Sequence, residues 1–267
     1  MGRCGMATTI EGIEYDVLAP AYDLMTAGYD YDRWLDALLE WARGHGLRGR
    51  RALDVACGTG KSFVPLLEQG FEVVACDQSQ GMLAIAATKV PDPRAIHRYD
   101  MRTLPVLGSF DLITCIDDSL NHLLEPAEVR DALAAMGRNL APGGLLVFDV
   151  NTIVAYRTAF ATAHVFEVGE HVFAWRGLGT ENAQPGCEAE VQVDVFGPSA
   201  ADPSLYRRTS STHRERHYPV AEIEALAAAA GLEIVDRRGQ SPGVVLHPQI
   251  DEERHSKALF LARKETR

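Results

Sequence analysis

The sequence is short of basic side chains and has no long apolar run, and each shortage excludes a class of protein. Lys and Arg number 26 against 37 Asp and Glu, so the formal net charge of the 267 residues is −11 at pH 7. An acidic surface repels phosphate, which argues against broad binding to nucleic acid or to an anionic membrane. No stretch approaches the roughly 18 consecutive apolar residues that would predict a membrane-spanning helix.

Cysteines are also scarce, and none of the five forms a C-x-x-C pair. An odd, scattered set fits a reducing cytoplasm better than a disulfide framework. The segment Met1–Met6 lacks the apolar run of a signal peptide and the Ser or Thr that myristoylation requires at position 6. We therefore expect a cytoplasmic protein. The cysteines are Cys4, Cys57, Cys76, Cys115 and Cys187.

What the sequence does contain is a regular alternation of strand-like and helical segments. This alternation predicts right-handed βαβ units and a parallel sheet. Residues 11–45 precede it and are expected to be helical, because apolar side chains recur there at helical spacing. The expected strands are 52–56, 71–76, 95–99, 110–116 and 145–150, and the expected helices between them are 61–69, 79–89 and 126–140.

The pattern changes after Asn151. Short alternating stretches broken by Pro-Gly and Gly-Pro pairs predict an antiparallel meander over 163–218. A helix at 220–230 and strands at 232–237 and 258–262 are expected to follow. We thus predict an α/β fold, with a Rossmann-like, seven-stranded, mostly parallel sheet and an antiparallel β insertion. The predicted parts are a helical cover (1–48), the sheet domain (49–151 and 219–267) and the insertion (152–218), which we expect to act as a substrate lid.

A glycine-rich loop over residues 53–60, Leu-Asp-Val-Ala-Cys-Gly-Thr-Gly, connects the first expected strand to the first helix. Glycines let backbone amides approach a ligand closely. A phosphate-binding P-loop is disfavoured because Val55 stands where its first glycine belongs. A dinucleotide-binding loop is disfavoured because Phe63 occupies the position where such a loop has its third glycine. A dinucleotide-binding loop would also leave Asp54 unexplained.

The loop resembles the first motif of class I S-adenosylmethionine (SAM)-dependent methyltransferases. Four more segments match the family in order and spacing: 77–79, 100–101, 110–115 and 140–145. The resemblance covers about residues 12–151. It implies SAM as the cofactor and S-adenosylhomocysteine (SAH) as its product. It further implies that Asp54 orders the loop and meets the methionine ammonium, that Asp77 accepts from the ribose hydroxyls, and that Asp100 and Met101 contact the adenine.

The segment 15–34 is similar to bacterial small-molecule methyltransferases that include amino-sugar N,N-dimethyltransferases. In that group N-terminal tyrosines close over the cofactor, and an aromatic face stabilises a cation such as the sulfonium. The alternative is that Tyr15 and Tyr22, seven residues apart, bury one face of a helix. Related enzymes are often dimers, so a homodimer is implied too. The predicted cofactor-binding residues are Tyr15, Tyr22, Trp34, Asp54, Ala56, Gly58, Gly60, Asp77, Gln78, Met82, Asp100, Met101 and Ile116.

The segment 116–123 leaves the fourth expected strand. Ligands of open α/β sheets lie at the carboxyl ends of the strands, so this segment should face the transferred methyl group. The resemblance implies that His122 is the general base. An amine attacks only when deprotonated, and a histidine can take that proton at neutral pH. The alternative for His122 is local capping or packing.

Asp117 and Asp118 depart from the amino-sugar enzymes. They could hold a cationic amine or serve as turn residues, and Asn121 and His217 are further candidate substrate contacts. His213, Glu215 and His217 should share one face of a strand, but no further ligand is apparent, and we predict no metal.

The sequence therefore predicts a SAM-dependent methyltransferase that acts on a small molecule, foremost on an amine nitrogen. Transfer to oxygen or carbon remains an alternative, because His122 could serve an acidic hydroxyl too. A non-catalytic SAM-binding regulator is less favoured, since His122 and the cofactor motifs are intact. The acidic charge and the expected lid disfavour an RNA or protein substrate.

Overall fold

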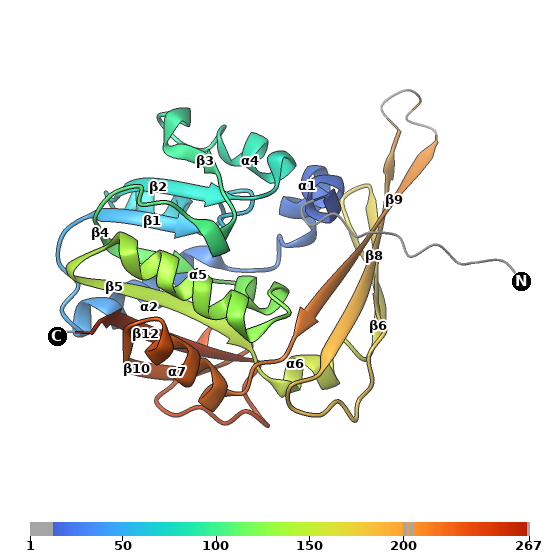
Figure 1. Ribbon diagram of the computed structural model, residues 1–267. Helices are drawn as coiled ribbons and strands as arrows, with labels where there is room; N and C mark the ends of the chain where they lie inside the picture. The colour runs from blue at the N-terminus through green and yellow to red at the C-terminus, as the bar shows by residue number, and fades with distance from the viewer. Residues whose placement is uncertain (1–12, 200–201, 203–204, 266–267) are drawn as a thin grey trace, which may run out of the picture.

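The computed structural model describes residues 13–199, 202 and 205–265, which form two β-sheets flanked by helices (Figure 1). Cys4 and the segment Met1–Met6 lie outside the described residues. The main sheet has the strand order β11-β10-β12-β5-β4-β1-β2-β3. Its strands are β1 (Arg51–Val55), β2 (Glu72–Asp77), β3 (Ile96–Arg98), β4 (Phe110–Cys115), β5 (Leu140–Asn151), β10 (Leu232–Ser241), β11 (Val245–His247) and β12 (Lys257–Lys264).

The predicted α/β fold with a mostly parallel sheet is confirmed. Strands β3, β2, β1, β4 and β5 run parallel, and β12, β10 and β11 add an antiparallel edge. The described part of the sheet has eight strands where seven were predicted. The additional strand, β11, is three residues long and pairs with β10 at the edge, so its sequence is too short to carry a periodic signal.

The central strands are apolar because helices cover both faces of the sheet. On one face α5 (Pro126–Asn139) and α7 (Val220–Ala229) pack against β4, β5 and β12. On the other face α2 (Tyr31–Gly44), α3 (Val64–Glu68) and α4 (Gln80–Ala86) build a second apolar cluster. Ser79 caps α4 by accepting from the Met82 N–H, and Pro126 begins α5, as the sequence predicted.

The helix expected over 11–45 is two helices. Helix α1 (Ile13–Met25) ends before a turn, and Asp30 then caps α2 by accepting from the Arg33 N–H. Helix α3 is also shorter than predicted. It begins at Val64 because Gly60, at φ +90°, turns the chain tightly beneath the Phe63 ring.

The predicted antiparallel meander is the second sheet, in the order β6-β7-β8-β9. Its strands are β6 (Ala163–Val168), β7 (His171–Gly177), β8 (Glu188–Pro198) and β9 (Tyr206–Arg216), and α6 (Ile153–Arg157) leads into it. Figure 1 shows this sheet beside α1, on the side toward which the carboxyl ends of β1 and β2 point. Leu18 and Ala21 of α1 pack into the apolar cluster of this sheet. Ligand-sized space is therefore expected where α1, the second sheet and these strand ends meet.

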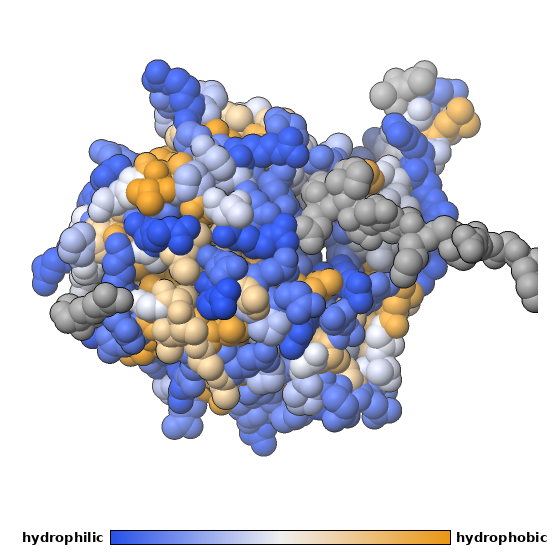
Figure 2. Space-filling view, in the orientation of Figure 1, coloured by the Kyte–Doolittle hydropathy of each residue, from blue (hydrophilic) through white to orange (hydrophobic). Residues whose placement is uncertain are grey.

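Figure 2 shows a mainly hydrophilic face on which apolar side chains gather in small groups. No helix in the described part of the chain is long and apolar enough to cross a membrane.

Candidate functional site

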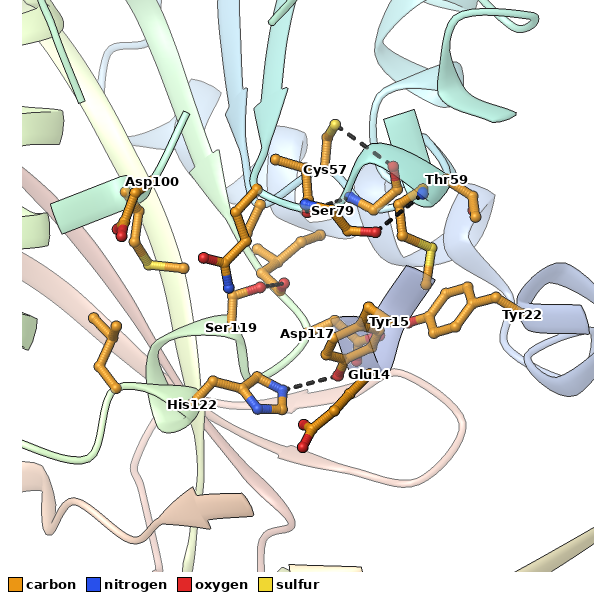
Figure 3. A pocket seen from close by; sticks show the side chains of 18 of the residues that line it. Glu14, Tyr15, Tyr22, Cys57, Thr59, Ser79, Asp100, Asp117, Ser119 and His122 are labelled. Carbon is orange, nitrogen blue, oxygen red and sulfur yellow. Dashed lines mark hydrogen bonds between the residues drawn. The ribbon is translucent and has the colours of Figure 1, made fainter. Parts of the chain in front are cut away.

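A cavity of about 480 Å³ opens at the carboxyl ends of β1, β2 and β4, between these strands and α1 (Figure 3). Residues of β8 and β9 complete its wall. Most of the predicted site residues meet there, although they come from distant parts of the chain. Those that line the cavity are Tyr15, Tyr22, Ala56, Gly58, Asp77, Gln78, Met82, Asp100, Met101, Ile116, Asp117 and His122.

The glycine loop turns through left-handed backbone conformations, with φ of 58° at Ala56, 52° at Gly58 and 90° at Gly60. A β-carbon at Gly58 would meet nothing within 4 Å, so the backbone is open toward the cavity. A β-carbon at Gly60 would collide with the Phe63 ring. Gly60 does not line the cavity, and its role is to permit this packing.

Asp54 also lies outside the cavity lining, fully buried below the loop. Its carboxylate accepts hydrogen bonds from Ser62 Oγ at 2.5 Å and from Thr114 Oγ1 at 2.6 Å. Burial raises the pKa of Asp54 to about 6, against the effect of these two hydroxyls. Asp54 thus ties the loop to β4, and its predicted contact with the methionine ammonium stays a prediction.

Asp77 ends β2 and faces the cavity. Its two oxygens accept from the backbone N–H groups of Gly58, at 2.9 Å, and Ser79, at 2.8 Å. Burial raises the pKa of Asp77, and these backbone bonds oppose the rise. A carboxylate oxygen has a second lone pair, so Asp77 can still accept from the hydroxyls of a ligand.

Asp100 and Met101 line the cavity after β3. Partial burial raises the pKa of Asp100. The Arg102 guanidinium, with Nη2 2.6 Å from Asp100 Oδ2, has the larger effect, so the pKa of Asp100 is lowered overall. Arg102 also pairs with Glu128 of α5, which holds the group in place. Asp77 and Asp100 thus place two acceptors along one wall, as the hydroxyls and the amine of a nucleoside require.

Helix α1 is fixed across the cavity by two acidic side chains. Asp16 accepts from Ser79 Oγ at 2.5 Å and from the Gly81 N–H at 2.7 Å. Asp23 accepts from Thr59 Oγ1 at 2.5 Å and from Lys89 Nζ at 2.6 Å. These contacts join α1 to the glycine loop and to α4.

Tyr15 and Tyr22 project from α1 into the cavity, as Figure 3 shows. Their ring centroids are 6.3 Å apart, in an edge-to-face arrangement. Burial raises the pKa of both hydroxyls well above the ordinary value, so both are neutral at neutral pH. Both tyrosines therefore line the cavity, and Tyr15 also packs against His213; their contact with the cofactor stays a prediction.

His122 lies in the short helix η3 (Ser119–His122) that follows β4. Its Nε2 is 2.9 Å from the Tyr15 hydroxyl and 3.8 Å from Oε1 of Glu215. Burial lowers the pKa of His122, and the charge of Asp118 partly offsets this. His122 is therefore a neutral imidazole at neutral pH, and the Tyr15 hydroxyl donates to its Nε2 lone pair.

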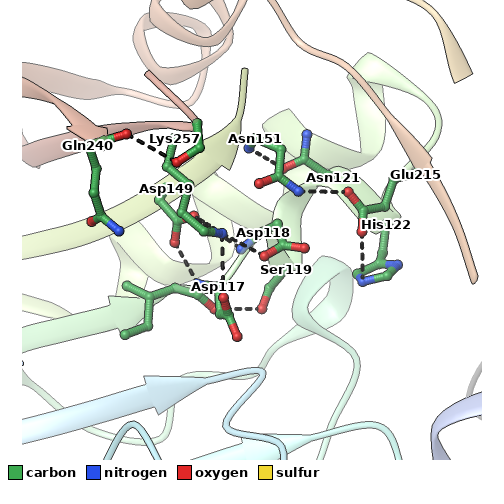
Figure 4. A network of polar contacts seen from close by, with 12 residues as sticks. Asp117, Asp118, Ser119, Asn121, His122, Asp149, Asn151, Glu215, Gln240 and Lys257 are labelled. Atoms are coloured by element: carbon green, nitrogen blue, oxygen red, sulfur yellow. Dashed lines mark hydrogen bonds and ion pairs between the residues drawn. The ribbon is translucent and has the colours of Figure 1, made fainter. Parts of the chain in front are cut away.

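A buried ionic network holds the turn between β4 and η3 (Figure 4). Asp117 and Asp118 have positive φ values of 65° and 55°, and their N–H groups donate to the carboxylate of Asp149. Lys257 of β12 places its Nζ 2.6 Å from Asp118 Oδ1, 2.9 Å from Asp149 Oδ2 and 3.4 Å from Asp117 Oδ1. The network gives Asp117 and Asp118 partners within the protein itself.

Besides Asp54 and Gly60, four predicted contacts do not line the cavity: Asp118 of the ionic network, Asn121, His217 and Trp34. Asn121 is buried and bridges η3 to β5 and β9, because its side chain binds the Asn151 N–H, at 2.9 Å, and the Arg216 carbonyl, at 2.8 Å. His217 is buried against Tyr156, with its Nδ1 accepting from a backbone N–H. Trp34 lies in the apolar cluster of α2, with the Lys257 ammonium 5.8 Å from its ring centroid.

Asp118, His122 and Glu215 place donor atoms within 4.8 Å of one another, a spacing that a metal ion could bridge. Two features favour a shared proton instead. Burial, and then the Asp118 charge, raise the pKa of Glu215 well above the ordinary value, and the two carboxyls are hydrogen-bonded. Asp118 also already binds the ammonium of Lys257. The donor set thus fits a protonated Glu215 beside an ionised Asp118.

Several residues of the site were not predicted. Asp149 and Lys257 join the network from β5 and β12, and no local pattern marks them. His213 and Glu215 do share one face of β9, as their spacing suggested, and that face is buried. Further lining residues without a prediction are Glu14, Tyr31, Lys61, Tyr99, Arg102, Leu124, Glu190, Thr212 and Arg214.

Comparison with known proteins adds independent findings. Residues 52–144 match a family model described as a methyltransferase domain. A putative methyltransferase of Geobacillus sp. (strain WCH70) is 30% identical over 226 residues, which cover 83% of this chain and 90% of that protein. A dTDP-3-amino-3,6-dideoxy-alpha-D-glucopyranose N,N-dimethyltransferase of Streptomyces fradiae is 34% identical over 134 residues, or 49% and 52% of the two chains. A crystal structure of an S-adenosylmethionine-dependent methyltransferase from Clostridium acetobutylicum superposes with a TM-score of 0.77 at 24% identity, covering 94% of this chain and 99% of that one.

Proposed function

Because this chain belongs to the SAM-dependent methyltransferases, we propose that it methylates the nitrogen of a small-molecule amine, with His122 as the general base. The observation that carries this proposal is the neutral imidazole of His122, which faces the cavity at the carboxyl end of β4. A relative that matches about half of this chain, over 134 residues, is by name a dTDP-3-amino-3,6-dideoxy-alpha-D-glucopyranose N,N-dimethyltransferase, which favours nitrogen as the acceptor atom.

The residues that line the cavity fit the cofactor. Gly58 opens the backbone of the loop, Asp77 offers acceptors for the ribose hydroxyls, and Asp100 with Met101 offers a site for the adenine. Tyr15 and Tyr22 then cover the opposite side from α1. Bound there, SAM supplies an electrophilic methyl group on a sulfonium.

The chain's own residues must prepare the acceptor. At neutral pH an alkylamine is an ammonium ion and has no free lone pair. The acceptor's N–H replaces the Tyr15 hydroxyl at Nε2 of His122, and His122 takes this proton, which frees the lone pair of the acceptor nitrogen. That lone pair forms the new bond to the methyl carbon as the carbon–sulfur bond breaks. The electron pair of the broken carbon–sulfur bond stays on sulfur. Asp118 lies close enough for its negative charge to stabilise the imidazolium that results.

The proposal is tested by a methyl-transfer screen across amines, phenols and carboxylic acids, with SAH release as the rate and product mass as the identity. We expect the wild type to methylate an amine. The rate of this transfer should fall at least about a hundredfold in His122→Asn, which is the lower end of what general base catalysis contributes. The exposed His164→Asn is the matched control and should keep the wild-type rate. Transfer only to a phenol or a carboxylic acid would overturn nitrogen as the acceptor. Full activity in His122→Asn would overturn the base.

A further inference from the structure

Asp117 presents a carboxylate to the cavity at the carboxyl end of β4. Its side chain is 21% exposed and lines the cavity, as does its neighbour Ile116. The other two acids of the buried network, Asp118 and Asp149, do not line the cavity. Asp117 is therefore the member of this network that a bound ligand meets.

The network has more negative than positive charge. Three carboxylates and one ammonium give −3 + 1 = −2 when all four groups are ionised. Lys257 is closest to Asp118 and Asp149, at 2.6 and 2.9 Å, and is 3.4 Å from Asp117. The Lys257 ammonium is thus closer to Asp118 and Asp149 than to Asp117. Asp117, which lines the cavity, is therefore the least neutralised of the three carboxylates.

The carboxylate of Asp117 is also held rigidly. Tyr31 Oη of α2 donates to its Oδ2 at 2.6 Å, and the Asp117 N–H donates to Asp149 Oδ1 at 2.5 Å. A fixed charge in a partly buried site acts more strongly than one in water and needs no reorganisation when a ligand binds.

We propose that Asp117 supplies a fixed negative charge that favours the sulfonium cofactor SAM over its product SAH. SAM and SAH share the adenosine and the methionine ammonium and carboxylate, and they differ in one methyl group and in the positive charge on sulfur. A carboxylate facing the sulfur therefore stabilises SAM and loses its partner on methyl transfer, which favours exchange of product for fresh cofactor. The proposal rests on SAM occupying this cavity with its methionine end toward β4.

Several charged or titratable groups surround Asp117 and set the pH range of the effect. They come from α1, the turn before α2, α2 itself, the residue after the glycine loop, the turn before η3, β5 and β12. These groups are Tyr15, Tyr22, Tyr29, Tyr31, Lys61, Asp118, Asp149 and Lys257. Burial raises the pKa of Asp117 to about 6, although Lys257 opposes the rise. The preference for SAM should therefore be present above about pH 6 and weaken below it.

The test is calorimetric titration of SAM and of SAH into wild type, Asp117→Asn and the control Asp32→Asn. Asp32 is an exposed acid of α2 that does not line the cavity. We expect the ratio of the SAH to the SAM dissociation constant to fall on the order of tenfold in Asp117→Asn, as one charge lost at close range implies. The ratio should stay at the wild-type value in Asp32→Asn.

An equal loss of SAM and SAH affinity in Asp117→Asn would overturn the proposal, because it would mean contact with the shared ammonium or a structural defect. An unchanged ratio together with a raised KM for the acceptor would overturn it as well, and would assign Asp117 to the acceptor. If Asp117→Asn does not fold, the wild-type ratio measured from about pH 8 to about pH 5 is the second test, and a constant ratio contradicts the proposal. Wild type that binds neither ligand would instead contradict the proposed function.

Discussion

The hydroxyl of Tyr15 lies 2.9 Å from Nε2 of His122, which joins α1 to the turn after β4 across the cavity. Burial keeps Tyr15 neutral, so it donates to the imidazole and stabilises the neutral form of the base. Tyr15→Phe removes this donor, and the pKa of His122 should rise. We expect the acid limb of the kcat/KM against pH profile to move to higher pH by up to about one pH unit, the size of one hydrogen bond.

Tyr22→Phe is the matched control for that experiment, because Tyr22 lies on the same helix and lines the same cavity. Its hydroxyl makes no contact with His122 among the hydrogen bonds of the described residues, so the acid limb should stay in place. If Tyr15→Phe leaves the limb where wild type has it, the coupling of Tyr15 to the base is refuted.

Glu215 should make stability fall as pH rises. Its side chain is 5% exposed, and burial, then the Asp118 charge, raise its pKa well above the ordinary value. In the unfolded chain Glu215 ionises near its ordinary pKa, while in the folded chain it keeps its proton. The stability from this group is fully present below the ordinary pKa and is lost as pH rises toward the folded-state pKa.

Glu215→Gln replaces the protonated acid by an amide that cannot ionise. We expect the variant to gain on the order of 1–2 kcal/mol over wild type between about pH 5 and about pH 8, since one pKa unit is worth about 1.4 kcal/mol. Urea unfolding at both pH values measures the gain. The exposed Glu190→Gln serves as control, with no gain expected. Identical pH dependence in wild type and Glu215→Gln would contradict a protonated Glu215.

Lys257 should be essential to the fold because it neutralises buried carboxylates. Its side chain is 11% exposed and Asp149 is fully buried. Lys257→Met leaves these acids without a counter-charge, and breaking such a buried pair costs about 3–5 kcal/mol. Adding Asp149→Asn to that variant should recover part of the loss. Chemical denaturation measures each free energy of unfolding.

The control for Lys257 is Lys264→Met at the exposed end of the same strand, where Nζ donates to the Leu140 carbonyl. A loss within about 1 kcal/mol is expected for this single exposed hydrogen bond. Equal losses in the two lysine variants would mean that the buried network does not stabilise the protein.

The parallel sheet and the cofactor end of the cavity could be predicted because their signals are local. Each strand is an apolar run, and Asp77 and Asp100 directly follow the strands that place them. The same logic placed Asp117 and His122 after β4. Short elements such as β11 could not be predicted, because three residues are too few to show a periodic pattern of apolar side chains.

The ionic network could not be predicted, because it depends on contacts between distant strands. Lys257 reaches Asp149 through the antiparallel pairing of β12 with β5, in which Lys257 lies opposite Asn151. Glu215 meets Asp118 only because β9 returns beside η3. Trp34 was assigned to the cofactor by resemblance, whereas its ring is buried among the leucines of α2.

The central claim is that the cavity at the carboxyl ends of β1, β2 and β4 binds SAM beside His122, and a calorimetric titration of SAM tests it most directly. We expect wild type to bind SAM at one site and Asp77→Asn to bind at least about tenfold more weakly, because hydrogen bonds to a charged group contribute about 1.5–3 kcal/mol. His122→Asn should bind SAM as wild type does, since His122 serves the acceptor. Undiminished SAM binding by Asp77→Asn, or no binding by wild type, would contradict the account.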